Sequence, residues 1–159
     1  MRLFLLLLLF PALAFASGLP TTGGSGTALE GDTVSVNGSA VKLWGIDAPE
    51  MGQTCKDARG RDYDCFERSK QALSRLIGRN QVECHMRGKA IGRQIGTCAV
   101  NGLDLAAMMV RDGWAMAYHG LSHQYVDLEG IAQARKRGIW SGHAEAPWLW
   151  RTARNNRNK

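Results

Sequence analysis

Long apolar runs are missing from most of this 159-residue chain, because only residues 3–10 form an unbroken hydrophobic stretch. A membrane-spanning helix needs about 20 mostly apolar residues, so no later segment is suited to cross a membrane. The chain also lacks a C-x-x-C pair, an internal repeat and any change of composition that would mark a second domain. We therefore expect one folded domain, as the length also indicates.

The N-terminal apolar stretch has the features of an export signal. Arg2 precedes it, and Ala14-Phe15-Ala16 provides a small-x-small cleavage site. We expect residues 1–17 to be a cleaved secretory signal peptide. The mature protein would then be periplasmic or secreted, with no stable membrane association. An uncleaved N-terminal anchor is the alternative.

Composition divides the rest of the chain into three parts. Residues 18–26 are rich in Gly, Ser and Thr and are expected to form a flexible leader, residues 27–151 the folded domain, and residues 152–159 a basic tail. The whole chain has 20 Lys and Arg against 14 Asp and Glu, a net charge of +6. Such a surplus suits a polyanion such as nucleic acid, but it suits any other anionic surface equally well.

Four cysteines fall within the predicted domain, and their even number indicates two disulfides in an oxidising compartment. Several pairings are possible. We favour Cys55–Cys65, which would close a polar loop, and Cys84–Cys98, which would link two strands of one hairpin. Each bond would add about 3 kcal/mol of stability. A zinc site is disfavoured because the spacings are long and no C-x-x-C pair is present.

The hydrophobic pattern predicts strands and helices in the order β-β-β-α-β-β-α-α, provided that the leader supplies the first strand. Asn37-Gly38 is a strong hairpin signal between two alternating runs. Helical spacing ends at Gly78, Gly113 and Gly138. The predicted elements are strands at 33–36, 41–46, 81–86 and 92–100, and helices at 65–77, 103–111 and 125–137. This order fits an α+β protein that is mainly a five-stranded, Greek-key barrel of the OB type with three helices.

Acidic residues cluster around the first predicted hairpin. Asp32 begins one strand and Asp47 ends the next, so a tight hairpin would bring their carboxylates together. Oxygen ligands of this kind suit a hard divalent cation. Glu50 follows closely and is a third ligand or a base acting on water. Ordinary turn chemistry is the competing interpretation.

Basic residues on the predicted strands favour the functional interpretation. Lys42 and Arg93 are placed to reach a phosphate held at such a metal, where cations neutralise charge that develops in the transition state. Barrels of the OB type also bind nucleic acids or sugars on one strand face.

The chain resembles the staphylococcal-nuclease-like (thermonuclease) family in motifs that span nearly the whole predicted domain in order. The motifs are Gly31-Asp32-Thr33, Leu43-x-Gly45-Ile46-Asp47-Ala48-Pro49-Glu50, Gly92-Arg93, Gly138-Ile139-Trp140 and Pro147-x-x-Trp150-Arg151. The resemblance implies a five-stranded OB barrel with three helices. It also implies a calcium-dependent endonuclease that hydrolyses phosphodiester bonds in DNA and RNA, preferably single-stranded. A monomer is expected.

The resemblance also implies a role for individual residues. Asp32 and Asp47 would be calcium ligands, and Ala48 would add its backbone carbonyl. Glu50 would be the general base, and Arg93 would bind the scissile phosphate. Tyr118 would line the nucleotide pocket. Lys89 is either a further phosphate contact or a solvated turn residue.

Two residues depart from the pattern of the family. Glu30 replaces an aspartate, which should have a mild effect. Lys42 replaces a second phosphate-binding arginine, and lysine lacks the planar fork that grips two phosphate oxygens. Losing one such contact would cost about 2–4 kcal/mol in the transition state. The alternative function is therefore a catalytically weakened OB module that binds nucleic acid or another polyanion without cleaving it.

Overall fold

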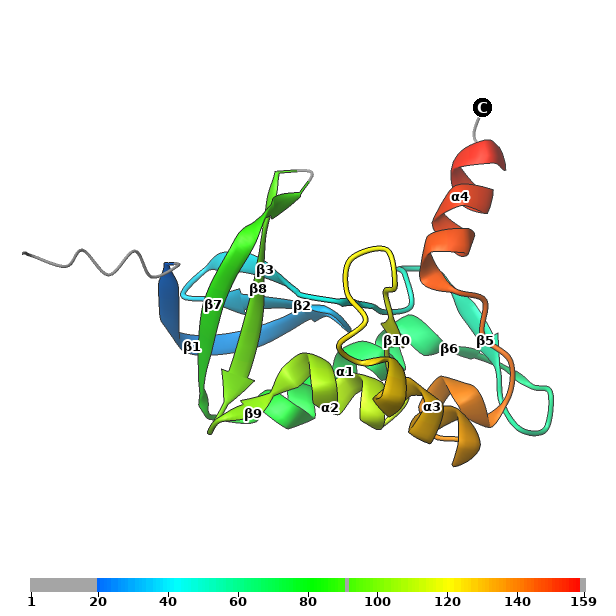
Figure 1. Ribbon diagram of the computed structural model, residues 1–159. Coiled ribbons are helices and arrows are strands. Elements are labelled where there is room, and N and C mark those ends of the chain that lie inside the picture. The colour runs from blue at the N-terminus through cyan, green and yellow to red at the C-terminus, as the bar shows by residue number, and fades with distance from the viewer. Residues whose placement is uncertain (1–19, 91, 158–159) are drawn as a thin grey trace, which may run out of the picture.

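The computed structural model describes residues 20–90 and 92–157. The predicted signal peptide, residues 1–17, lies outside this part of the chain. Figure 1 shows the long strands gathered on one side of the molecule and helices α1 to α3, together with short strands, on the other. No helix in the described residues is long and apolar enough to cross a membrane.

Five strands form a closed barrel. Their order is β3-β2-β1-β7-β8, and parallel pairing of β3 with β8 closes the ring. The two-residue strand β9 extends the sheet beside β8. The bounds are β1 (Thr21–Glu30), β2 (Thr33–Val36), β3 (Ser39–Leu43), β7 (Gln81–Ala90), β8 (Arg93–Val100) and β9 (Leu103–Asp104). The predicted α+β class and five-stranded OB-type barrel are confirmed.

The hairpin of β2 and β3 forms as predicted. Asn37 and Gly38 take φ angles of 50° and 82°, the left-handed conformation that a two-residue hairpin turn requires. Val34 faces Val41 across the pair, and both side chains are fully buried. The same register sets Thr33 opposite Lys42. As a result, the residue before Thr33 lies within reach of the lysine.

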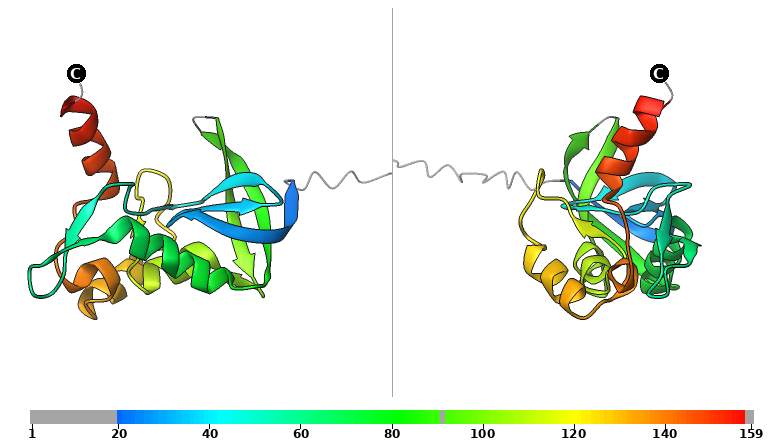
Figure 2. Two further views of the ribbon diagram at one scale, coloured as in Figure 1. Left: turned by 180° about the vertical axis from the view of Figure 1, so that it is seen from behind. Right: turned by 90° about the vertical axis from the view of Figure 1, so that its right-hand side faces the viewer.

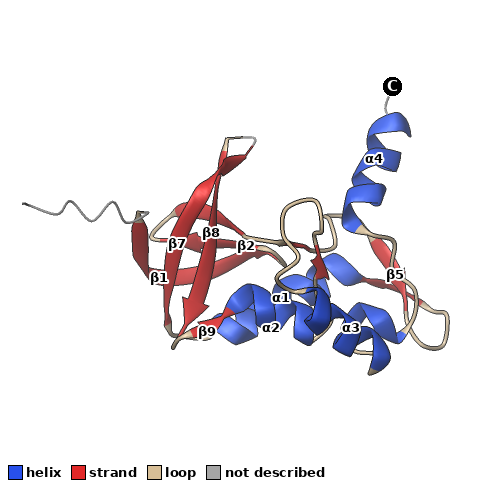
Figure 3. Cartoon of the chain, in the orientation of Figure 1, coloured by secondary structure: helices blue, strands red, loops and turns tan. Residues whose placement is uncertain are grey.

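Within residues 20–90 and 92–157, four α-helices and one 3-10 helix accompany the barrel (Figure 3). They are α1 (Cys65–Ile77), α2 (Leu105–Arg111), α3 (Val126–Ala134), the 3-10 helix Gly138–Ser141 and α4 (Pro147–Arg157). Helix α1 has the predicted bounds, and the Asp64 carboxylate caps it by accepting a hydrogen bond from the N–H of Glu67. The sequence predicted three helices and missed α4, which begins at a proline, a residue favoured at a helix start.

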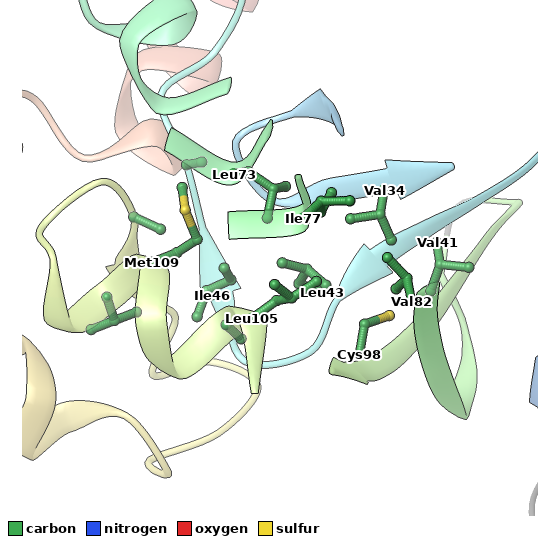
Figure 4. Close-up of a cluster of buried hydrophobic side chains, with 14 of the residues drawn as sticks. Val34, Val41, Leu43, Ile46, Leu73, Ile77, Val82, Cys98, Leu105 and Met109 are labelled. Atoms are coloured by element: carbon green, nitrogen blue, oxygen red, sulfur yellow. The ribbon is translucent and has the colours of Figure 1, made fainter. Parts of the chain in front are cut away.

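Helices α1 and α2 supply the side chains that fill the open end of the barrel. Figure 4 shows Leu73 and Ile77 of α1 and Leu105 and Met109 of α2 in one cluster with strand residues. Each of these four side chains is at most 2% exposed. One core therefore joins the barrel to helices α1 and α2.

Short strands attach the loops to this body. Strand β4 (Ile46–Asp47) pairs with β10 (Met116–Ala117), and β5 (Thr54–Lys56) pairs with β6 (Asp62–Asp64). The structure contains both predicted disulfides: Cys55–Cys65 joins β5 to the start of α1, and Cys84–Cys98 links facing residues of β7 and β8.

Residues 18–26 are expected either to form a flexible leader or to supply the first strand, and strand β1 begins within them. From Thr21 onward the chain is a strand paired with β2 on one side and β7 on the other. The glycines that indicated flexibility allow close packing here, because a Cβ on Gly26 would lie 2.3 Å from Cγ2 of Val82. Glycine thus marks close approach in this strand rather than disorder.

The C-terminal boundary also differs from the prediction. Residues 152–157, expected as a basic tail, continue α4 without a break. Figures 1 and 2 show this helix projecting away from the body. Arg154 and Arg157 are exposed on it, so its outer part is solvated as the charge pattern indicated.

We predict that Asp104 stabilises the fold by joining the start of α2 to Tyr125. Its Oδ1 accepts hydrogen bonds from the N–H groups of Ala106 and Ala107 at 2.9 and 3.3 Å, and its Oδ2 accepts one from the hydroxyl of buried Tyr125 at 2.7 Å. Asp104→Ala removes a helix cap and leaves a buried hydroxyl unpaired, so urea unfolding should show a loss of about 2–4 kcal/mol.

Asp62→Ala is the matched control, because Asp62 makes only an exposed ion pair with Lys56. It should change the free energy of unfolding by less than about 0.5 kcal/mol. Equal losses in the two variants would contradict the role of Asp104.

Candidate active site

A cleft of about 510 Å³ lies where β3, β4 and β8 meet the base of α4. It contains most of the residues that the sequence singled out. The lining residues are Glu30, Lys42, Leu43, Ile46, Asp47, Glu50, Arg93, Ile95, Tyr118, Leu121 and Arg151.

Asp32 lies buried beside this cleft, only 2% exposed. Its carboxylate accepts hydrogen bonds from the N–H of Ala48 at 2.9 Å, the hydroxyl of Thr33 at 2.9 Å and Nζ of Lys42 at 2.7 Å. Burial opposes ionisation, but the lysine charge and these donors outweigh it and hold the pKa of Asp32 below its ordinary value. The carboxylate is therefore charged at neutral pH.

Lys42 lies between two carboxylates. Its Nζ is 2.7 Å from Oδ2 of Asp32 and 3.1 Å from Oδ1 of Asp47. Burial disfavours the ammonium, yet the two carboxylates together raise the pKa of Lys42 above its ordinary value. The predicted pair of aspartates thus converges on one positive centre.

Arg151 is a site residue to which the sequence assigned no role. From the first turns of α4, its Nη1 and Nη2 bind Oδ1 and Oδ2 of Asp47 at 3.1 and 2.6 Å, and Nη1 also binds Glu50. These hydrogen bonds to Asp47 and Glu50 raise the pKa of Arg151 further above its already high ordinary value. The only sequence signal was its place at the end of the Pro147-x-x-Trp150-Arg151 motif.

Gln53 is a second residue that sequence reasoning missed. Its side chain is 1% exposed; Oε1 accepts from the N–H of Glu50 at 3.0 Å, and Nε2 donates to the carbonyl of Glu145 at 2.7 Å. It therefore ties the turn that carries Glu50 to the segment that leads into α4.

The remaining predicted residues lie at different depths. Arg93 is 3.4 Å from the Glu30 carboxylate, and its side chain is 55% exposed. Tyr118 packs against Trp148, with ring centroids 5.5 Å apart. Lys89 is exposed on β7 and is not among the described residues that line the cleft.

The donor set can be tested against a divalent cation. In the described part of the chain, no three His, Cys, Asp or Glu side chains are grouped so that they could hold a metal by themselves. Asp32 and Asp47 nevertheless converge on the ammonium of Lys42, so their oxygens already surround one cationic position. Two carboxylates fit a hard cation that takes its other ligands from backbone oxygen and water.

The profile of the family described as "Staphylococcal nuclease homologue" matches residues 40–142. The chain belongs to this family. The chain is also similar to several curated proteins. It is 32% identical over 141 residues to the "Succinoglycan biosynthesis protein ExoI" of Rhizobium meliloti, covering 84% of this chain and 72% of that protein.

The chain spans different shares of two further relatives. A "Probable staphylococcal-like nuclease CAN3" of Oryza sativa is 31% identical over 90% of this chain, which spans only 36% of the rice protein. An "Uncharacterized endonuclease" of Haemophilus influenzae is 30% identical over 92% of this chain and 82% of its own length.

The candidate site residues lie within the matched segment, before it and after it. Lys42, Asp47, Glu50 and Arg93 fall within residues 40–142. Asp32 precedes the match, and Arg151 follows it on α4. The second guanidinium of the cleft therefore comes from a helix beyond the part of the chain that the family profile matches.

We predict that Gln53→Met destabilises this staphylococcal nuclease homologue by about 2–4 kcal/mol. The change keeps the side-chain size but leaves the Glu50 N–H and the Glu145 carbonyl without their partner. Urea unfolding measures the loss. Gln71→Met is the control, because exposed Gln71 bonds only the neighbouring Glu67 side chain, and it should change stability by less than about 0.5 kcal/mol. A neutral Gln53→Met would contradict the proposed tie.

Proposed function

We propose that the protein is an exported, calcium-dependent nuclease that hydrolyses phosphodiester bonds of DNA and RNA. The observation that carries this proposal is the convergence of Asp32 and Asp47 on one cationic position in a cleft that also contains Glu50 and Arg93. Membership of the staphylococcal nuclease family supports it. The nuclease names of the rice and Haemophilus relatives point the same way, whereas the Rhizobium name refers to succinoglycan biosynthesis.

Each residue has a part in this reaction. Asp32 and Asp47, with the backbone carbonyl of Ala48, would hold the calcium ion. Bound calcium would neutralise charge on the phosphate. Glu50 accepts a proton from the attacking water as the new P–O bond forms and the bond to the leaving oxygen breaks. Arg93 binds the phosphate and stabilises the charge that develops on it. The leaving oxygen takes its proton from solvent.

The ammonium of Lys42 must leave the position between the aspartates when a metal binds there. It is tethered to β3 and lines the cleft, so it can turn toward the phosphate instead. A lysine offers a point charge rather than a planar fork. Taken alone, it should support a lower rate than arginine would.

The proposed substrate is single-stranded DNA or RNA, and Tyr118 at the cleft wall offers a surface on which a base can stack. Lys89 remains a proposed outer phosphate contact. The two disulfides suit an oxidising compartment, which supports export to the periplasm or the medium. We propose that the protein acts as a monomer.

A second candidate function is binding of nucleic acid without cleavage. The observation that favours it is Lys42, because the cleft wall formed by β3 contributes an ammonium where a guanidinium would hold the phosphate better. Salt-dependent binding of single strands without hydrolysis would select this function.

The test is cleavage of denatured DNA by oxidised protein with calcium or with chelator. We expect cleavage only with calcium. Glu50→Gln should lower the rate by about 10²–10⁴-fold, because it removes the base. Glu83→Gln makes the same chemical change at an exposed position of β7 and should leave the rate unchanged. An equal cleavage rate with calcium and with chelator would refute the proposal, as would a Glu50→Gln rate equal to that of the parent.

A further inference from the structure

Arg151 reaches the cleft from α4, outside the segment that the family profile matches. We propose that Arg151 is a phosphate-binding residue, which exchanges its contacts with Asp47 and Glu50 for the substrate phosphate when a divalent cation binds. This inference rests on the proposed nuclease function. It assigns to α4 a direct part in binding nucleic acid.

Arg151 lies next to Lys42 at the proposed metal-binding aspartate. Oδ1 of Asp47 is 3.1 Å from Nζ of Lys42 and 3.1 Å from Nη1 of Arg151. The ammonium and the guanidinium are thus neighbours on one oxygen atom. The Arg151 side chain remains 39% exposed toward the cleft, so a ligand can reach it.

The guanidinium of Arg151 is better suited to phosphate than the ammonium of Lys42. A guanidinium presents N–H donors in a planar fork that matches two oxygens of a phosphate, whereas an ammonium cannot. Arg151 already uses such a fork on both oxygens of Asp47. The same geometry suits a phosphodiester, and it supplies on this side of the cleft what Lys42 lacks.

The net charge of the cleft changes sign when a divalent cation binds. Asp32, Asp47 and Glu50 face Lys42 and Arg151, which leaves this cluster with one net negative charge. A divalent cation at the aspartates reverses the sign of the cluster. It also competes directly with Arg151 for Asp47. With Asp47 bound to the cation, the guanidinium is attracted to the substrate phosphate, an anion that enters the cleft beside Glu50.

The base of α4 has other contacts that hold it in place when Arg151 leaves Asp47 and Glu50. Trp148 packs on Tyr118, and Arg154 donates to the carbonyl of Met51 at 3.1 Å. Gln53 holds the Glu145 carbonyl just before the helix. Contacts on both sides of Arg151 therefore keep its guanidinium at the cleft while the side chain turns.

A purely structural role is the competing explanation, in which Arg151 only clamps α4 to the barrel. The two explanations differ in the sign of one measurement. If Arg151 competes with the metal, Arg151→Ala should bind calcium several-fold more tightly in calorimetry without nucleic acid, while cleavage of denatured DNA falls by roughly 10–10²-fold. If the residue is only a clamp, calcium affinity and cleavage should fall together, and that outcome overturns the proposal.

Arg157→Ala is the matched control, because it removes the same charge from the exposed end of the same helix. We expect it to leave both calcium affinity and cleavage within about twofold of the parent. Arg151→Lys keeps the charge without the fork and should recover less than half of the lost rate on a logarithmic scale. An Arg157→Ala loss as large as that of Arg151→Ala would reduce the effect to general electrostatics and overturn the proposal.

A double-variant comparison tests the fork itself. Lys42→Arg places a guanidinium on β3, beside the position of Arg151. It should change the parent rate by less than about threefold but raise the Arg151→Ala rate by about tenfold or more. Equal effects in the two backgrounds would overturn the proposal.

Binding separates this inference from the proposed function. A labelled, single-stranded oligodeoxynucleotide is titrated in fluorescence anisotropy, first with chelator and then with calcium. Calcium should strengthen binding to the parent and to Arg157→Ala at least threefold more than binding to Arg151→Ala. This holds even for a parent that does not cleave, an outcome that refutes the nuclease proposal alone. Equal strengthening in all three proteins refutes the role of Arg151.

Discussion

The buried carboxylate of Asp47 requires positive charge, and the cations that provide it come from opposite ends of the folded domain. Lys42 approaches from β3 and Arg151 from α4, and both bind the same oxygen atom. An unpaired charge at a side chain that is only 2% exposed would cost several kcal/mol. The mouth of the barrel and the C-terminal helix are therefore coupled through one acidic group.

Much of the barrel was predictable because its signals are local. Asn37-Gly38 specifies a hairpin by its backbone conformation, and the helix at 65–77 follows from side-chain spacing with a cap before it. Strand β1 was left open between a flexible leader and a first strand, because its glycines look the same in flexible chain and in a strand that packs closely. Only the partner, Val82 against Gly26, distinguishes the two, and that contact is remote in sequence.

The same distinction applies to the cleft. Asp32, Asp47 and Glu50 could be predicted to meet because a short hairpin and one turn connect them. Arg151 and Gln53 could not, since each acts through a partner about a hundred residues away: Asp47 for Arg151 and Glu145 for Gln53. The residues that follow Arg151 resembled a solvated tail, since their only charged side chains are basic. What the sequence lacks is the information that one arginine of α4 points inward.

One consequence of the long separation concerns the order of synthesis. Arg151 lies 104 residues after Asp47 in the chain. Every other residue that lines the cleft, up to Leu121, leaves the ribosome earlier. Among the cleft residues, the acidic centre and its partner Lys42 are synthesised early, and the second guanidinium is synthesised last. The lining of the cleft is therefore complete only once α4 has been synthesised.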